Sequence, residues 1–204
     1  MKSIAILILA AGASTRFGSC KQLAKVGDKS LLQHCITTAN QLIPHAVYVV
    51  LGANAQRIAP TLSNVTVIVN QQWQAGIGES IACGIRQLEP LYQGVLVLLA
   101  DQPHIQSGHL QSMLSKFTGN EIVCGFYQGK RGVPAIFPRS CFEALTTLSG
   151  DQGAKNILQE SRERVIEQRL PEAAFDIDTV AQLSALNVYR QKQAANTISQ
   201  QERR

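Results

Sequence analysis

The sequence predicts an α/β fold: a single-domain, three-layer α/β/α sandwich built around a mostly parallel sheet. Short apolar runs of strand length alternate along the chain with segments whose apolar residues recur at helical spacing. The runs are apolar throughout, as in strands that are buried on both faces. The 204 residues suffice for one substantial core, and they contain neither an internal repeat nor an interdomain linker.

The first half of the chain shows this alternation most regularly. An apolar run at residues 4–9 predicts a buried strand, and small residues follow it. Gly27 and Asp28 mark a turn, after which Ser30 is placed to cap a helix that starts at Leu31. The further elements expected in this half are strands at 46–51 and 65–69, a helix from near Ser80, and a strand at 95–100.

The second half is less regular. A helical stripe follows Gly108, and strands at 122–127 and 133–137 flank a glycine-bounded turn, which predicts a hairpin. The remaining expected elements are helices at 138–148 and 154–160, short strands at 164–170 and 175–177, and a helix at 179–186. We therefore place the folded domain at residues 1–187. The polar, Gln-rich segment 188–204 is expected to be a frayed helix or disordered.

Composition and charge narrow the classes of function. With 45% hydrophobic residues and no apolar run of membrane-spanning length, the chain is expected to be globular and not a membrane protein. The formal net charge is +5, and aromatic residues make up only 5%. No nucleic-acid partner is expected from this balance, whereas an anionic small molecule suits a positive surface. The five cysteines are an odd number without a C-x-x-C pair, which favours a cytoplasmic location.

The stretch ILILAAGASTRFGSCK at residues 6–21 is the most informative part of the chain. Its apolar run opens into small residues, whose backbone N–H groups a ligand can approach closely. Arg16 and Lys21 bring fixed positive charge to the same place, and this combination suits a polyphosphate. A plain strand-to-helix turn and a secretory signal peptide are the alternatives. The glycine patterns of dinucleotide-binding folds and of P-loops are absent.

Asp101 directly follows the apolar run at 95–100. If that strand is a neighbour of the first one, their carboxyl ends meet at one sheet edge and Asp101 lies beside the small-residue loop. A carboxylate near phosphates needs a hard cation between them, and Mg²⁺ is the natural choice. Asp176 and Asp178, on one side of a short strand, could supply a second carboxylate. Capping roles for Asp101, before Pro103, and for Asp178, before the last helix, stay open.

Six motifs in this order resemble the nucleotidyltransferases with a molybdenum-cofactor guanylyltransferase-like fold, most closely the molybdenum cofactor cytidylyltransferases. They are LAAGASTRFGSCKQL (9–23), WQAGIGESIACGI (73–85), LLADQP (98–103), GVPAIF (132–137), LSGDQGAKNIL (148–158) and DIDT (176–179). The resemblance covers nearly all of residues 4–186 and implies a Rossmann-like nucleotidyltransferase fold. It also implies Mg²⁺-dependent transfer of a nucleotide from an NTP to a terminal phosphate, with release of pyrophosphate and no covalent protein intermediate.

The resemblance implies three groups of site residues. The nucleotide-binding residues are Ala10, Ala11, Gly12, Arg16, Lys21, Gly78 and Ser80. The catalytic residues are Arg16, Lys21 and Asp101, of which the two cations hold the triphosphate and stabilise the charge on the leaving pyrophosphate. The Mg²⁺ ligands are Asp101 and Asp178.

The resemblance also bears on the substrates. Guanylyl-transferring relatives carry Gly-Gly where this chain has Ala11-Gly12, as the cytidylyl-transferring branch does. The methyl group of Ala11 narrows the base pocket, so CTP is the expected donor. The expected acceptor is the molybdenum cofactor (molybdopterin), and a xanthine-dehydrogenase-type molybdoenzyme would receive the product. The residues around Gly132, Pro134, Asp151 and Lys155 resemble the acceptor side, although Asp151 could instead cap the helix that follows.

Three alternatives stay open. The same fold could transfer another nucleotide or use a sugar or alditol phosphate as acceptor. A non-catalytic carrier that hands the cofactor to a molybdoenzyme is a second reading, against which Lys21 and Asp101 count, because a carrier needs neither. A nicotinamide oxidoreductase is the third, and the glycine fingerprint that it requires is missing.

Overall fold

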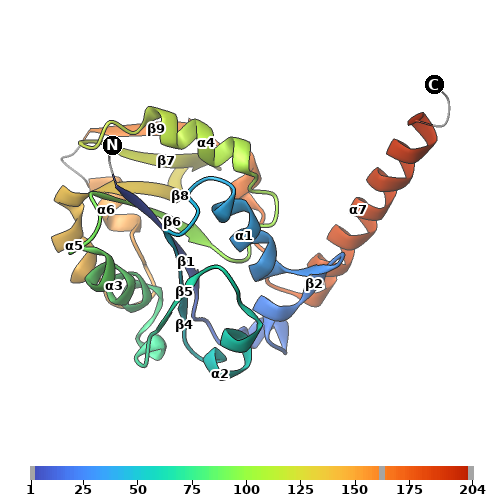
Figure 1. Cartoon of the computed structure of the whole chain (residues 1–204), viewed down its shortest axis with the longest axis horizontal. Coiled ribbons are helices and arrows are strands. Elements are labelled where there is room, and N and C mark those ends of the chain that lie inside the picture. The colour runs from blue at the N-terminus through green and yellow to red at the C-terminus, as the bar shows by residue number, and fades with distance from the viewer. Residues whose placement is uncertain (1–2, 161–163, 202–204) are drawn as a thin grey trace.

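The computed structural model describes residues 3–160 and 164–201. Its centre is a seven-stranded sheet in the order β5-β4-β1-β6-β8-β7-β9 (Figure 1). The strands are β1 (Ile4–Ala10), β4 (Val47–Leu51), β5 (Thr66–Val69), β6 (Gly94–Leu99), β7 (Ile122–Tyr127), β8 (Lys130–Pro138) and β9 (Val165–Arg169). Strand β8 is antiparallel to both of its neighbours, and the other pairings in this sheet are parallel. The predicted mostly parallel α/β fold is therefore confirmed.

Helices cover both faces of this sheet (Figure 1). The helices of the chain are α1 (Leu31–Asn40), α2 (Ala55–Ile58), α3 (Ile77–Leu88), α4 (Ser107–Lys116), α5 (Phe142–Thr146), α6 (Lys155–Glu160) and α7 (Val180–Gln201), of which α7 does not cover the sheet. The apolar side chains of α1 and α4 pack on one face, and those of α3, α5 and α6 pack on the other. A small hairpin of β2 (Lys25–Val26) and β3 (Lys29–Ser30) precedes α1, at the predicted turn.

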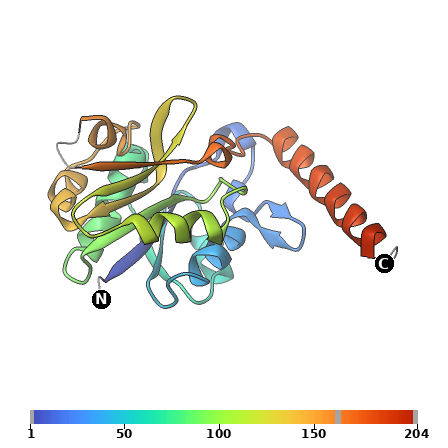
Figure 2. The ribbon, with the colours of Figure 1, turned by 90° about the horizontal axis from the view of Figure 1, so that it is seen from above.

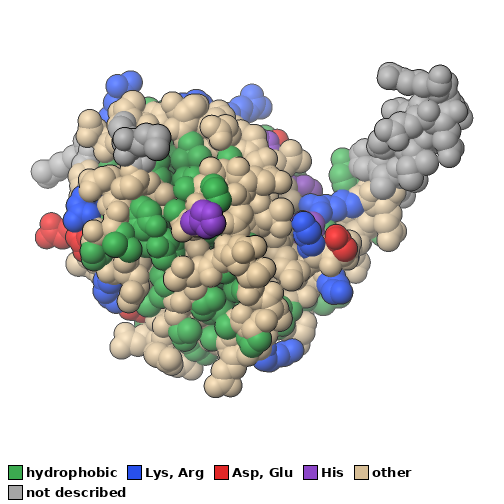
Figure 3. Space-filling model, in the orientation of Figure 1, with side chains coloured by type: hydrophobic (Ala, Val, Ile, Leu, Met, Phe, Trp, Pro, Cys, Tyr) green, Lys and Arg blue, Asp and Glu red, His purple; other side chains and the backbone are tan. Residues whose placement is uncertain are grey.

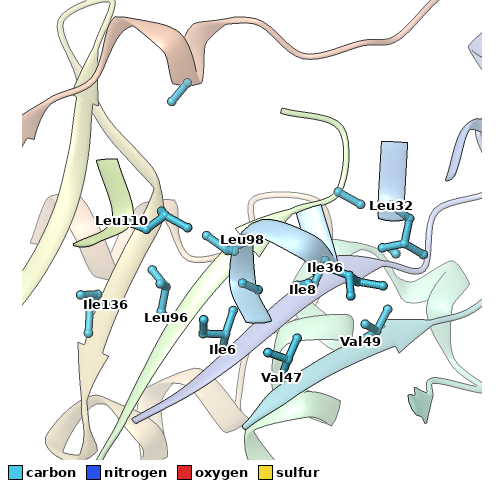
Figure 4. Close-up of a cluster of buried hydrophobic side chains, with 14 of the residues drawn as sticks. Ile6, Ile8, Leu32, Ile36, Val47, Val49, Leu96, Leu98, Leu110 and Ile136 are labelled. Carbon is cyan, nitrogen blue, oxygen red and sulfur yellow. The ribbon is translucent and has the colours of Figure 1, made fainter. Parts of the chain in front are cut away.

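Strand β1 is buried on both faces, as its unbroken apolar sequence predicts. Ile6 and Ile8 belong to the cluster on the α1 and α4 side, which Figure 4 shows. Leu7 and Leu9 belong to the cluster on the α3 side. Each such side chain contributes roughly 1.5–3 kcal/mol when it leaves water, so this strand is firmly fixed in the middle of the sheet. The loop that follows it therefore starts from a rigid base.

Helix α1 begins where the sequence predicts. The Ser30 Oγ accepts from the backbone N–H of Gln33, and the Gln33 Oε1 accepts from the backbone N–H of Ser30, a reciprocal capping box. Helix α3 begins at Ile77, earlier than the expected start near Ser80. The residue before it, Gly76, has a φ of 99°, a conformation that favours glycine and that ends the preceding turn.

The segment at 175–177 and the last helix differ from the expected secondary structure. Residues 175–177 form no strand, because the segment crosses the end of β6 with one recorded backbone bond, from the Ile177 N–H to the Asp101 carbonyl. Helix α7 extends beyond the expected end at residue 186 and projects from the body (Figure 2). Two residues in the first half of α7 attach it to the body. The Asn187 side chain forms hydrogen bonds with the backbone of the β2–β3 hairpin, and the Arg190 side chain donates to the Pro103 carbonyl. The domain boundary at residue 187 stays a prediction.

The cysteines act as packing residues. All five are free thiols, and Cys35, Cys83 and Cys124 lie on α1, α3 and β7, as predicted. Burial raises the pKa of the Cys35 thiol to about 12 and that of Cys124 to about 11. Both thiols are therefore protonated near neutral pH and unsuited to nucleophilic chemistry.

The outer surface adds two observations. None of the helices within the described ranges combines the length and the apolar character needed to cross a bilayer.

The positive charge of the surface is spread out. On the face shown in Figure 3, the Lys and Arg side chains are scattered toward the edges rather than gathered in one patch.

Candidate active site

A cavity of about 430 Å³ opens at the carboxyl ends of β1 and β6. These two strands pair directly, with Leu9 opposite Leu99, so the loop after β1 and the residue after β6 share one edge of the sheet. The volume is that of a typical small-molecule site. Eight of the nine predicted site residues line it: Ala10, Ala11, Gly12, Arg16, Lys21, Ser80, Asp101 and Asp178. The ninth, Gly78, is not among the lining residues.

The loop after β1 directs carbonyl groups toward the protein. The carbonyls of Ala10 and Gly12 both accept from the Gln22 Nε2, at 3.1 and 2.9 Å. Within the described residues, no protein acceptor is recorded for the backbone N–H groups of residues 12–14. A loop that uses its carbonyls internally and leaves successive N–H groups free is suited to bind an anion.

The wall that carries Ala11 is held by a close backbone approach. The Ala11 carbonyl accepts from the backbone N–H of Ala53 at 3.1 Å. A Cβ at Gly52 would come within 2.6 Å of that carbonyl oxygen and 2.5 Å of the Trp73 Cβ, so only glycine fits at residue 52. Gly52, just after β4, thus lies in close contact with both Ala11 and Trp73. Both of these residues line the cavity.

A charged cluster also lines the cavity. The Lys21 Nζ lies 2.7 Å from the Asp101 Oδ2 and 3.0 Å from the Asp178 Oδ1. The Arg16 Nη1 lies 3.2 Å from the Asp178 Oδ2, but the Arg16 side chain is 79% exposed, so this third ion pair contributes little to stability. Burial lowers the pKa of Lys21, yet the attraction of Asp101 and Asp178 outweighs it and leaves the pKa above its ordinary value. Lys21 is therefore charged throughout the physiological range.

Asp101 has a free buried oxygen. Among the residues that the structure describes, its Oδ1 is buried without a hydrogen-bond partner. A buried acceptor without a hydrogen-bond partner lowers the stability of the fold by on the order of 1–3 kcal/mol or more. Because this oxygen has no partner, it can accept a further ligand. Two converging carboxylates fit Mg²⁺, which takes one or two carboxylates together with substrate phosphates. No group of three or more His, Cys, Asp or Glu side chains suited to a metal occurs in the described part of the chain.

The capping alternatives are not adopted. Thr179 caps α7 through its Oγ1, which accepts from the Gln182 N–H, while the Gln182 Oε1 accepts from the Thr179 N–H. The Asp178 carboxylate instead faces the cations. Asp101 pairs with Lys21 through one oxygen, and the other has no partner in the described residues. Asp176 lies outside the cavity lining, and loss of hydration together with the negative charge of Asp101 raises its pKa.

The start of α3 contributes one of its two predicted residues to the cavity. Ser80 lines it, and its Oγ accepts from the Asn70 Nδ2 at 3.1 Å. Gly78 packs on the backbone of the turn at 148–150: its N–H donates to the Gly150 carbonyl, and a Cβ would come within 2.6 Å of the Ser149 carbonyl oxygen. Gly78 thus allows α3 to approach that turn.

Sequence reasoning missed several residues of the cavity. Among them, the Gln22 side chain makes four hydrogen bonds and is buried, and a polar residue after Lys21 gave no sign of this burial. Asp151, which the resemblance assigns to the acceptor side, lines the same cavity as Ala11, whereas Lys155 is not among the lining residues. The other lining residues near the start of α3 are Trp73, Gln74, Gly76 and Ile77.

Known proteins resemble the chain in sequence and in fold. The family described as "MobA-like NTP transferase domain" matches residues 6–165. Rv0371c from Mycobacterium tuberculosis H37Rv is 26% identical, with a TM-score of 0.80 over 91% of this chain and 97% of that one. A structure of Rv0371c in complex with manganese gives a TM-score of 0.76, at 26% identity, over 90% and 97% of the two chains.

Two further comparisons bear on the fold and on the family. Molybdopterin-guanine dinucleotide biosynthesis protein A from Archaeoglobus fulgidus is 15% identical, with a TM-score of 0.66 over 92% of this chain and 98% of that one, and shares the fold. The bifunctional protein GlmU of Corynebacterium diphtheriae is 33% identical over 125 residues, which are 57% of this chain and 26% of GlmU. The chain spans about a quarter of the length of the curated relatives that it matches.

Proposed function

Because this chain belongs to the MobA-like NTP transferase domain family and is a nucleotidyltransferase, we propose that it transfers CMP from CTP to the molybdenum cofactor. The acceptor group is the terminal phosphate of molybdopterin, and pyrophosphate is released. The observation that carries the proposal is one cavity that unites free loop N–H groups, the Lys21 cluster and the methyl group of Ala11. A cytoplasmic location and delivery to a xanthine-dehydrogenase-type molybdoenzyme complete the proposal.

Nucleotidyltransferases of this family generally use a divalent metal ion. We propose Mg²⁺ in this chain, held by Asp101 and Asp178, because the free Asp101 Oδ1 and the converging carboxylates suit a hard cation. When bound, the ion neutralises phosphate charge and acts as a Lewis acid.

The chain's own residues position the reactants and compensate charge. The N–H groups of residues 12–14 and the Arg16 side chain bind the triphosphate. An oxygen of the acceptor phosphate attacks the α-phosphorus, and the bond from the α-phosphorus to its bridging oxygen breaks. Lys21 stabilises the negative charge that develops on the departing pyrophosphate. Catalysis then rests on alignment and charge compensation, as in other phosphoryl-group transfers.

The choice of CTP rests on Ala11. Ala11 lines the cavity, as does Trp73, and Gly52 packs closely against the Ala11 carbonyl and the Trp73 side chain. A methyl group on a fixed wall takes space that a purine base would need. The smaller pyrimidine ring is the better fit.

Replacing Ala11 with glycine should shift the preference toward a purine. Loss of one methyl group from a fixed pocket wall is worth about 10- to 100-fold in discrimination, so we expect the ratio of kcat/KM for GTP to that for CTP to rise by that factor. Steady-state pyrophosphate release with each nucleotide measures the ratio. Ala53→Gly is the matched control, since Ala53 donates its N–H to the same loop but does not line the cavity. An unchanged ratio in Ala11→Gly would remove the basis for choosing CTP.

The substrates are tested by measuring pyrophosphate release with each of the four NTPs, with and without a molybdopterin-type acceptor and Mg²⁺. Turnover that needs CTP, the acceptor and the ion supports the proposal. Turnover with another NTP, or with a sugar or alditol phosphate, would reassign the substrates within the family. Nucleotide binding without turnover under any condition would favour a carrier.

A further inference from the structure

The side chain of Gln22 is buried behind the loop after β1, with 5% of its surface exposed. Its Nε2 donates to the carbonyls of Ala10, at 3.1 Å, and Gly12, at 2.9 Å. Its Oε1 accepts from the Ser14 Oγ, at 3.2 Å, and from the Cys20 Sγ, at 3.4 Å. A primary amide has two donor hydrogens and one acceptor oxygen, and this one uses all of them on the segment between the end of β1 and the start of its own 3-10 turn.

These contacts fix the direction of the loop's peptide groups. In a planar trans peptide the C=O and the following N–H point to opposite sides. The carbonyl of Gly12 is directed at Gln22, so the N–H of Ala13 points away from it. The same relation holds for the carbonyl of Ala10 and the N–H of Ala11. Ala11 and Ala13 both line the cavity.

The local fold also links this contact to the charged cluster. Lys21 and Gln22 are consecutive residues of one 3-10 turn, Lys21–Leu23. The Lys21 side chain reaches Asp101 and Asp178, while the Gln22 side chain holds the loop. One short turn therefore fixes the loop relative to the cation.

We propose that Gln22 is a positioning residue for nucleotide binding: it holds the loop carbonyls so that the free N–H groups of the loop, including that of Ala13, face the triphosphate. This inference rests on the proposed nucleotide site. Gln22 itself transfers no proton and touches no reacting atom. Its effect falls on the affinity for the nucleotide, because a loop whose peptide groups can rotate binds the phosphates with fewer aligned donors.

The test is Gln22→Met, which keeps the length of the side chain and removes both donors. Trp73 is the only tryptophan in the chain and lines the same cavity, so its fluorescence follows CTP binding in the presence of Mg²⁺. We expect the Kd for CTP to rise at least about 10-fold. The Kd for Mn²⁺ alone, measured by electron paramagnetic resonance, should stay within about twofold of wild type, since Asp101 and Asp178 are intact.

Gln33→Met is the matched control. Gln33 is also a hydrogen-bonded glutamine, but it caps α1 and lies outside the cavity lining. Its replacement should lower Tm and leave the Kd for CTP unchanged. If Gln22→Met does not fold, Gln22→Asn takes its place: the amide is kept, but it is one methylene too short to reach both carbonyls, so a similar loss of affinity is expected.

The outcomes separate this inference from the proposed function. If the wild-type protein binds none of the four NTPs, the nucleotide site itself is wrong. If wild type binds CTP and Gln22→Met or Gln22→Asn binds it equally well, Gln22 is only a packing residue. A rise in the Kd for CTP in the Gln22 variants, with none in Gln33→Met, supports the positioning role.

Discussion

Replacing Lys21 with alanine is expected to lower kcat at least about 100-fold, the scale that follows the loss of one preorganised charge-stabilising group. Lys21 is the cation nearest to Asp101 and Asp178, and its side chain is only 14% exposed. Water cannot readily replace a charge in so enclosed a place. Pyrophosphate release at saturating nucleotide and acceptor measures the effect.

Two controls show whether the loss of rate is specific to Lys21 and whether the variant is folded. Lys25→Ala removes an exposed lysine of β2 that lies outside the cavity lining, and it should leave kcat unchanged. A thermal unfolding curve of Lys21→Ala shows whether the unpaired Asp101 and Asp178 have disturbed the fold. A folded Lys21→Ala protein with a near-normal rate would contradict the catalytic role of the lysine.

Replacing Asp101 with alanine is expected to lower kcat by a similar factor, at least about 100-fold. One of its oxygens holds Lys21, and the other is buried without a partner in the described residues. The substitution therefore removes a proposed ion ligand and half of the anchor of the lysine. We also expect Mn²⁺ affinity to fall strongly, which electron paramagnetic resonance detects without any turnover.

Asp101→Asn separates charge from size. It keeps the shape of the side chain but cannot offer two ionised oxygens, so it should lose Mn²⁺ affinity as Asp101→Ala does. Asp28→Asn, in the exposed β2–β3 turn, is the matched control and should behave as wild type. Wild-type Mn²⁺ affinity in Asp101→Asn would show that the ion is held elsewhere.

The proximity of Asp101 to the loop after β1 could be predicted, because it follows from the geometry of parallel sheets. An unbroken apolar run predicts a strand buried on both faces, and the carboxyl ends of neighbouring parallel strands share an edge. What the sequence left open was whether the two strands are neighbours. The pairing of Leu9 with Leu99 confirms that they are.

Features that depend on contacts between distant residues could not be predicted. The segment at 175–177 has strand-like residues, yet it makes one recorded backbone bond to the end of β6 instead of a ladder. The length of α7 depends partly on Asn187, which bonds the β2–β3 hairpin far away in the sequence. The burial of Gln22 depends on how the loop after β1 turns back over it. Local pattern carries no information on any of these.

The most direct measurement is a crystal structure with CTP and Mn²⁺, in which the anomalous signal of manganese locates the ion. We expect the triphosphate to contact the N–H groups of residues 12–14 and the ion to lie on Asp101 and Asp178. Manganese bound away from both carboxylates, or a triphosphate that does not touch the loop, would contradict a shared site and with it the proposed transfer chemistry.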